Sequence, residues 1–199
     1  MGVDITFFAE QRSPDGDWSI VGELVPNLDY FPDDPDSANE PELVPPSLNI
    51  PRCSPLFAIL ANVNNTRTVE PYETIAMPRG LPDNATPEAR AWFNAWQGAF
   101  AASWLTLDEI DNFNWSQITQ QYGSVDSQAA HLFDNNPLGF PFDQWPDGLQ
   151  ISYSVSPTDT GNARWRTTNA ESAGFKWFRE MLVPYENLDV VRFIFWFDH

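Results

Sequence analysis

Cysteine, lysine and histidine are nearly missing from this sequence of 199 residues, which has one Cys, one Lys and two His. A single Cys cannot form an intrachain disulfide, and this fits a reducing compartment. No apolar run approaches the ~20 residues that a membrane-spanning helix needs. The first residues include an acid and no basic region, so they do not resemble a signal peptide. We therefore expect a cytoplasmic protein without a membrane partner.

Positive charge of any kind is scarce. Ten basic residues stand against 28 acidic ones, which gives a net charge of −18. Phosphate contacts need clustered Lys and Arg, so the sequence does not predict direct binding to nucleic acid. Two interpretations of the acidity stay open. It is either a solvated acidic surface or an acidic face that docks on a basic, nucleic-acid-binding partner.

Familiar catalytic motifs are missing as well. The sequence has no G-x-S-x-G elbow, no Walker A motif and no G-x-G-x-x-G. His131 has no second His at the spacing of a zinc site, and Cys53 has no nearby His to activate it. We interpret Cys53 as a packing residue and expect no metal and no cofactor. The carboxylates that could perform acid–base or Mg²⁺ chemistry are Asp4, Glu10, Asp108 and Asp198. With 28 acids in the chain some pair is always available, so these candidates discriminate little.

Residues 25–51 are dense in proline and in acid. Pro occurs at positions 26, 32, 35, 41, 45, 46 and 51, and no basic residue lies between Arg12 and Arg52. Proline at this density excludes a regular helix or a central strand, so we predict a long acidic, Pro-rich loop. The spacing of its acids does not fit an EF-hand Ca²⁺ site. The acids that we expect to bind a basic partner are Asp29, Asp33, Asp34, Asp36, Glu40 and Glu42.

Arg79 lies in the turn sequence Pro78-Arg79-Gly80-Leu81-Pro82. Pro and Gly at these positions indicate a rigid turn that presents the guanidinium group. Arg79 could bridge internal carboxylates, or it could anchor an anionic ligand. We favour the internal bridge and keep the ligand anchor as a possible site.

The most tightly specified local structure is a helix that begins at Leu107. Thr106 and Glu109 have the spacing of a capping box, and Leu105 and Ile110 that of a hydrophobic staple. The helix could continue to Tyr122, before Gly123, or it could be two short helices with a break near Asn114.

The remaining pattern predicts an α+β fold in a single domain, residues 1–199. The predicted strands are a hairpin of Asp4–Arg12 and Trp18–Leu24, then Ile151–Ser156, and finally Asp189–Phe197, which is covered on both faces. The other predicted helices are Pro55–Ala61 capped by Ser54, Pro87 to about Ala102, and Ala170 to about Val183 capped by Asn169. We expect the strands to form one mostly antiparallel sheet, on which helices near positions 55, 87, 107 and 170 pack.

Five blocks carry a resemblance to known sequences. MGVDITFFAEQR, SPLFAILANV, IAMPRGLP, SWLTLDEI and VRFIFWFD occur in this order. The chain thereby resembles a group of uncharacterised proteins of similar length from bacteriophages and prophages, with PRGLP and SWLTLDEI the distinctive blocks. Relatives often have His after the initial Asp-Ile and His-Ser before SWLTL, where this chain has Thr6 and Ala101-Ala102. The resemblance implies a phage context and no mechanism.

The residues favour a binding protein over an enzyme. A compact, acidic phage-type protein without catalytic motifs fits a non-enzymatic inhibitor of host defence. It would bind and block a basic, nucleic-acid-processing host or defence protein, and imitation of the charge of nucleic acid is one way to do so. The alternatives are a carboxylate- or metal-dependent enzyme and a small-ligand-binding protein.

Overall fold

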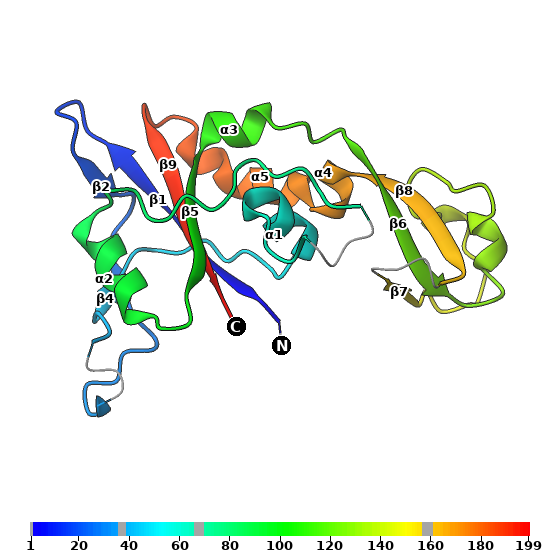
Figure 1. Cartoon of the computed structure of the whole chain (residues 1–199), viewed down its shortest axis with the longest axis horizontal. Helices are drawn as coiled ribbons and strands as arrows, with labels where there is room; N and C mark the ends of the chain where they lie inside the picture. The colour runs from blue at the N-terminus through cyan, green and yellow to red at the C-terminus, as the bar shows by residue number, and fades with distance from the viewer. Residues whose placement is uncertain (1, 36–38, 66–69, 157–160) are drawn as a thin grey trace. The chain divides into compact units, whose positions relative to one another are not determined.

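The computed structural model describes residues 2–35, 39–65, 70–156 and 161–199. This described chain is an α+β fold with antiparallel strand pairing, as the sequence predicted (Figure 1). Its contacts divide it into two compact units. The first unit comprises Met1–Arg52, Ala76–Asn112 and Phe178–His199, and the second comprises Cys53–Ile75 and Phe113–Trp177. The single domain across residues 1–199 stays a prediction.

The first unit contains a sheet in which, among the described residues, four strands follow the order β2-β1-β9-β5. These strands are β1 (Asp4–Arg12), β2 (Trp18–Ile20), β5 (Phe100–Thr106) and β9 (Val191–Asp198). The predicted hairpin is confirmed, although its second strand ends at Ile20 and not at Leu24. The predicted C-terminal strand is also confirmed, and it lies between β1 and β5.

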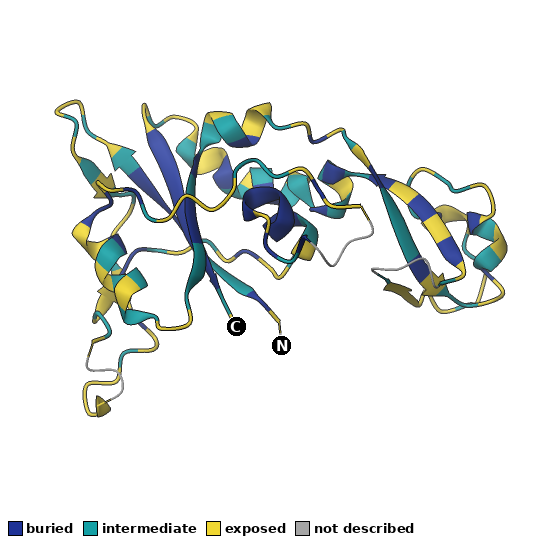
Figure 2. Ribbon diagram, in the orientation of Figure 1, coloured by how far each residue is buried: buried dark blue, intermediate teal, exposed yellow. Residues whose placement is uncertain are grey.

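The core of the first unit forms on both faces of β9. Seven of the eight residues of this strand are buried (Figure 2). On one face Phe7 stacks on Phe193 and Phe195, with ring centroids 5.3 and 5.5 Å apart. On the other face α2 (Pro87–Ala95) packs on the sheet and places Trp92 5.2 Å from Trp196. Burial on two faces explains why the strand is a nearly continuous apolar run.

The helix predicted from Pro87 to about Ala102 is shorter in the structure, because its last residues belong to strand β5. Helix α2 ends at Ala95, and the chain re-enters the sheet at Phe100 as the antiparallel neighbour of β9. The pairing shifts register between Phe100 and Ser103, where Ala101 adopts a positive φ of 50°. Such an irregularity is a β-bulge. The aromatic stripe of the helix therefore continues, at Phe100, into a strand.

The capping box is confirmed. The Thr106 amide donates to Glu109 Oε2 at 2.9 Å, and the Glu109 amide donates to Thr106 Oγ1 at 3.2 Å. Helix α3 (Leu107–Asn112) begins where the sequence predicted. It is short, however, and neither a helix to Tyr122 nor a second helix follows, because Ile118–Val125 is strand β6.

The second unit contains its own sheet, whose described strands have the order β7-β6-β8. Its strands are β6 (Ile118–Val125), β7 (Tyr153–Val155) and β8 (Ala163–Thr168). The predicted strand at 151–156 exists as β7, but its assignment to the first sheet is wrong, since β7 pairs with β6. Gly123 permits this pairing: a Cβ at this position would lie 2.1 Å from the carbonyl oxygen of Ser154.

Other helices whose bounds are described are α1 (Ser54–Ala61), η3 (Ala130–Phe133), η4 (Phe142–Gln144), α4 (Asn169–Ser172), α5 (Phe175–Leu182) and η5 (Val183–Tyr185). Helices α1 and α4 belong to the second unit, and not to the unit that holds the first sheet. Two predicted caps are wrong. Ser54 is the first residue of α1, and Thr168 caps α4 by accepting from the Glu171 amide. Asn169 is buried inside α4 and donates to Gln117 Oε1 at 3.0 Å. The predicted single helix is interrupted near Gly174, where φ is +62°.

Candidate functional site

The predicted acidic loop is closed at its base by two short strands, β3 (Val25–Pro26) and β4 (Leu43–Val44). Asn27 holds the base together. Its amide donates to the Glu42 carbonyl at 2.9 Å, and its side chain donates to the Pro41 carbonyl at 3.0 Å and to Glu40 Oε2 at 3.4 Å. We call residues 27–42, between the two strands, the acidic segment. Its ends are fixed by these bonds, in the manner of an Ω-loop.

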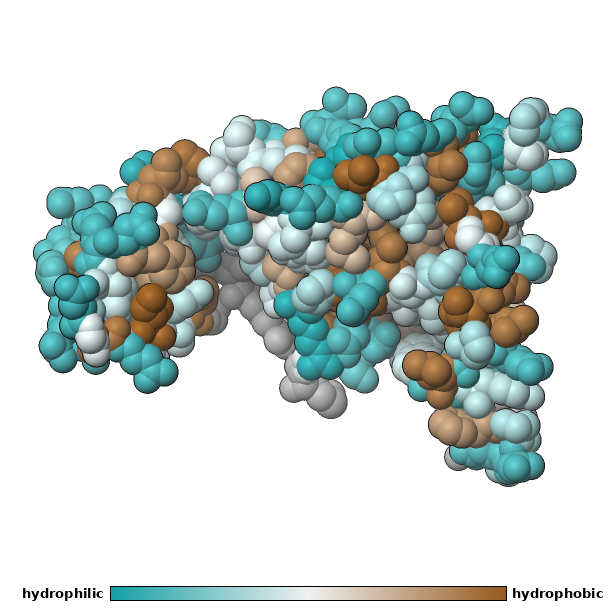
Figure 3. Space-filling model, turned by 180° about the vertical axis from the view of Figure 1, so that it is seen from behind, coloured by the Kyte–Doolittle hydropathy of each residue, from teal (hydrophilic) through white to brown (hydrophobic). Residues whose placement is uncertain are grey.

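The acidic segment presents both charge and apolar surface. Its exposed acids are Asp29, Asp33, Asp34 and Glu42; Glu40 is half-buried, and Asp36 lies outside the described residues. Leu28 is 87% exposed and Phe31 58% exposed. In Figure 3 hydrophobic atoms lie among hydrophilic ones over this segment, at the lower right. The sequence reasoning named the acids but missed these two apolar side chains. The signal was available, because Leu and Phe are unusual in a solvated acidic loop.

Arg79 forms the internal bridge that the sequence favoured. Its guanidinium donates to the two carboxylate oxygens of Glu109 at 2.6 and 3.2 Å, and to the Trp104 carbonyl at 3.2 Å. It also lies over the Trp104 ring, 4.8 Å from the centroid. Burial tends to raise the pKa of Glu109, but the hydrogen bonds from Arg79 and Thr106 outweigh it, so this pKa is lowered. An anionic ligand at Arg79 would have to displace Glu109.

Glu10, one of the carboxylate candidates, belongs to a buried ion pair. Its Oε2 accepts from Arg192 at 2.8 and 2.6 Å, and its Oε1 accepts from the Thr86 amide at 2.8 Å. Arg192 also donates to Asn84 Oδ1 at 2.7 Å and lies 3.8 Å from the centroid of the Trp18 ring. Burial lowers the pKa of Arg192. A pair enclosed on all these sides is structural, and a substrate has no access to it.

Asp4 and Asp198 are the candidates that the fold brings together among the described residues. They face each other on β1 and β9. A hydrogen-bonded ion pair with Arg52 lowers the pKa of Asp4, whereas burial and then the charge of Asp4 raise the pKa of Asp198. Two neighbouring carboxyl groups whose pKa values are shifted in opposite directions are suited to act as an acid and a base. Asp108 is exposed in the first turn of α3 and is not part of this pair.

Cys53 has the surroundings of a packing residue. Its thiol lies 3.7 Å from the Ser172 carbonyl, to which it donates a weak hydrogen bond. Burial raises the pKa of the thiol. A nucleophilic cysteine needs the opposite shift.

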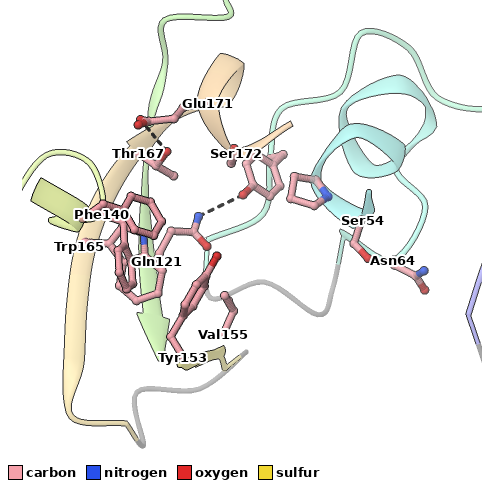
Figure 4. Close-up of a pocket in the computed structure, with 13 residues that line it drawn as sticks. Ser54, Asn64, Gln121, Phe140, Tyr153, Val155, Trp165, Thr167, Glu171 and Ser172 are labelled. Carbon is pink, nitrogen blue, oxygen red and sulfur yellow. Dashed lines mark hydrogen bonds between the residues drawn. The ribbon is translucent and has the colours of Figure 1, made fainter. Parts of the chain in front are cut away.

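A cavity of about 450 Å³ lies within the second unit (Figure 4). Its lining consists of Ser54, Pro55, Asn64, Tyr72, Gln121, Phe140, Phe142, Tyr153, Val155, Trp165, Thr167, Glu171 and Ser172. Phe140 joins the aromatic side chains, with centroids 4.6 Å from Tyr153, 4.5 Å from Phe142 and 5.4 Å from Trp165. The sequence reasoning identified none of this. These residues come from segments far apart in the chain, and no local pattern connects them.

Comparisons with models of known protein families, with curated proteins and with solved structures gave no match. Within the described residues, no group of three or more His, Cys, Asp or Glu side chains is placed to hold a metal ion. Among the helices that the structure describes, none combines the length and the apolar character needed to cross a bilayer. The features of this chain that bear on its function are therefore the acidic segment and the cavity of the second unit.

Proposed function

We propose that this protein is a non-enzymatic binding protein whose acidic segment docks on a basic protein partner. In the phage context implied by the sequence blocks, the partner is a nucleic-acid-processing host or defence protein, which the binding blocks. The single observation that carries the proposal is the surface of the acidic segment. Exposed Leu28 and Phe31 are flanked by exposed carboxylates on a segment whose base Asn27 closes.

The charged and the apolar side chains of the acidic segment would make different contributions to binding. Carboxylates attract a basic partner over distance and raise the association rate, but exposed charges contribute little affinity each. Buried aromatic and apolar anchors supply most of the affinity of an interface. Leu28 and Phe31 provide such anchors, with Asp29 between them in the sequence and Asp33 and Asp34 shortly after them. A fixed base to the segment reduces the entropy lost on binding.

The test begins with the immobilised protein and a lysate of the host. Captured proteins are identified, purified and measured for association against salt. The expected partner is basic, is displaced by duplex DNA, and associates more slowly as salt screens the charges over about 8 Å. A partner that is neither basic nor displaced by DNA would contradict the proposal.

Two triple variants with the same charge change then locate the interface. Asp29, Asp33 and Asp34 are changed to Asn in the first, and the exposed Asp134, Asp143 and Asp147 of the second unit are changed to Asn in the control. The first variant should lose association rate and salt dependence, and the control should retain both. A third variant, Leu28→Ser with Phe31→Ser, should increase the dissociation rate. Equal effects of the two triple variants would assign the acidity to general solubility.

A further inference from the structure

The cavity of the second unit carries a binding site that is independent of the proposed function. We propose that it binds a small organic cation, an ammonium or guanidinium group with apolar substituents. The proposal rests on an aromatic wall, a positioned carboxylate and the absence of basic side chains among the described lining residues.

The aromatic wall offers ring faces in two directions. The Trp165 ring is nearly perpendicular to Phe140 and to Tyr153, at 86° and 90°. Phe142 and Tyr153 are 50% and 48% exposed, so neither residue is fully covered by the protein. In Figure 4 Phe140, Trp165 and Tyr153 lie on one side of the cavity, opposite Ser54 and Asn64. The faces of aromatic rings carry partial negative charge and attract cations.

The carboxylate of Glu171 is positioned beside this wall. Its Oε2 accepts a hydrogen bond from the Thr167 hydroxyl at 3.0 Å. Its Oε1 lies 3.6 Å from the place that a Cβ on Gly139 would occupy, and so it is next to the backbone that leads into Phe140. The Glu171 amide is fixed in turn by the Thr168 hydroxyl at 3.2 Å. The carboxylate of Glu171 and the aromatic rings therefore line the same cavity.

One polar group of the cavity, the side-chain amide of Gln121, offers an acceptor for a hydrogen bond from a ligand. Gln121 donates through Nε2 to the Tyr72 hydroxyl at 3.0 Å. Among the described residues, no hydrogen bond engages Gln121 Oε1, which leaves an acceptor for an N–H group of the ligand.

The charge of the described lining disfavours the opposite class of ligand, an anion. The described lining includes the carboxylate of Glu171 and no Lys, Arg or His. Among the described residues, an anion in the cavity would meet the like charge of Glu171 and no basic side chain, which is unfavourable. The net charge of −18 adds an attraction for cations in solution. The cavity volume falls in the ordinary range for small-molecule sites.

The experiment compares cations with uncharged molecules of the same shape. Choline is paired with 3,3-dimethylbutan-1-ol, and phenylguanidine with phenylurea; each is titrated into the full-length protein by calorimetry and by ligand-observed NMR at low salt. We expect the preferred cation to bind about tenfold more tightly than its uncharged counterpart. The comparison between the two cations separates ammonium from guanidinium chemistry.

Three variants assign the effect to the cavity. Glu171→Gln should bring the affinity for the cation close to that for the uncharged counterpart. Phe142→Leu keeps apolar area but removes a ring face, and it should weaken only the cation, about two- to fivefold. Asp147→Asn makes the same charge change as Glu171→Gln at an exposed residue of the second unit outside the lining, and it should leave the affinity unchanged. Equal binding of cation and uncharged counterpart, an equal loss for both with Phe142→Leu, or no binding of either cation would overturn the proposal.

Discussion

Strands β9 and β6 both lie between two antiparallel neighbours, yet they are held in place differently. Seven of the eight residues of β9 are buried, whereas two of the eight residues of β6 are, Thr119 and Gly123. The side chains of β9 are mostly aromatic and aliphatic. Those of β6 include Gln120, whose amide pairs reciprocally with the Asn136 amide at 3.0 and 2.8 Å and also donates to the Trp165 carbonyl at 2.8 Å.

Because the two strands are held differently, the two sheets should respond differently to substitutions. Burial of apolar surface on two faces gives β9 a large share of the stability of its unit. A strand held by backbone pairing and neutral amide bonds has a smaller net contribution, because these groups also bond to water when unfolded. We therefore expect changes in β9 to act on the whole first unit and changes around β6 to act locally.

The largest effect should follow removal of β9. Deletion of Val190–His199 takes away the centre of the first sheet, and we expect the protein not to fold. Circular dichroism and thermal unfolding provide the measurement. Deletion of His199 alone, which leaves β9 complete, is the control and should retain a cooperative transition. A soluble truncated protein with an unchanged melting curve would show that the central position of β9 is not needed.

The next largest effect should come from breaking the buried ion pair. Arg192→Met leaves Glu10 buried without its partner, at a cost of about 3–5 kcal/mol in the free energy of unfolding. Denaturant titration measures the loss. Adding Glu10→Leu removes the unpaired charge, so the double variant should recover much of the stability. If the double variant loses the sum of the two single losses, the two side chains are not energetically coupled.

Gly123→Ala tests whether a change in the second sheet destabilises only the strands next to it. The added Cβ would clash with the carbonyl of Ser154 on β7, and we expect a loss of about 1–3 kcal/mol. Hydrogen exchange should increase at the β6–β7 pairing and remain unchanged in β9. Gly98→Ala is the control, because its nearest contact would be an ordinary 3.5 Å from Trp96. Faster exchange throughout both sheets would contradict the expected local response.

Loss of a single helix cap should lower the free energy of unfolding less than any of the three changes above. Thr106→Ala removes the hydroxyl that accepts from the Glu109 amide at 3.2 Å, and we expect a loss of about 1 kcal/mol. Thr106→Ser keeps the hydroxyl and should be close to the wild type in urea unfolding. An equal loss in both variants would indicate that the methyl group, and not the cap, is responsible.

The smallest predicted effect depends on pH and concerns Asp198. Its raised pKa means that the folded state favours the protonated carboxyl, so stability falls as the pH rises from the ordinary Asp pKa through the raised folded pKa, and the loss is complete above it. Asp198→Asn should therefore stabilise the protein at pH 7 by about 0.2–1 kcal/mol, the range for charges directly opposite across a strand pair. The gain should vanish below the ordinary Asp pKa, where both states are protonated. A gain that is the same at pH 3 and pH 7 would exclude this origin.

The contrast between the strands also explains which elements the sequence could predict. A strand buried on both faces must be apolar throughout, and VRFIFWF is recognisable on that ground alone. The capping box of α3 was equally local. Strand β8 alternates in burial, but Trp165 is the one large apolar side chain in it, so hydrophobic alternation alone does not mark it as a strand. Strand β5 follows a helical aromatic stripe, and its state is decided by pairing with the distant β9.

The candidate sites divide in the same way. The exposed acids of the acidic segment and the internal bridge of Arg79 were accessible to reasoning about charge and turns. The partner of Glu10 was not, because Glu10 and Arg192 are brought into register only by the pairing of β1 with β9. The cavity was hidden for a similar reason. Its wall draws Phe140, Tyr153 and Trp165 from separate segments, and tertiary structure alone places them together.

The turn that carries Arg79 has a consequence for self-association. Strand β5 is at an edge of the described first sheet, and an apolar edge invites pairing with another molecule. Here the Gly80 amide already donates to the Ala102 carbonyl at 2.8 Å, and Arg79 already donates to the Trp104 carbonyl. The bulge at Ala101 further spoils the regular ladder that an incoming strand would need. The turn at residues 78–82 thus occupies carbonyl groups of β5 that a strand from a second copy of the chain would need for pairing.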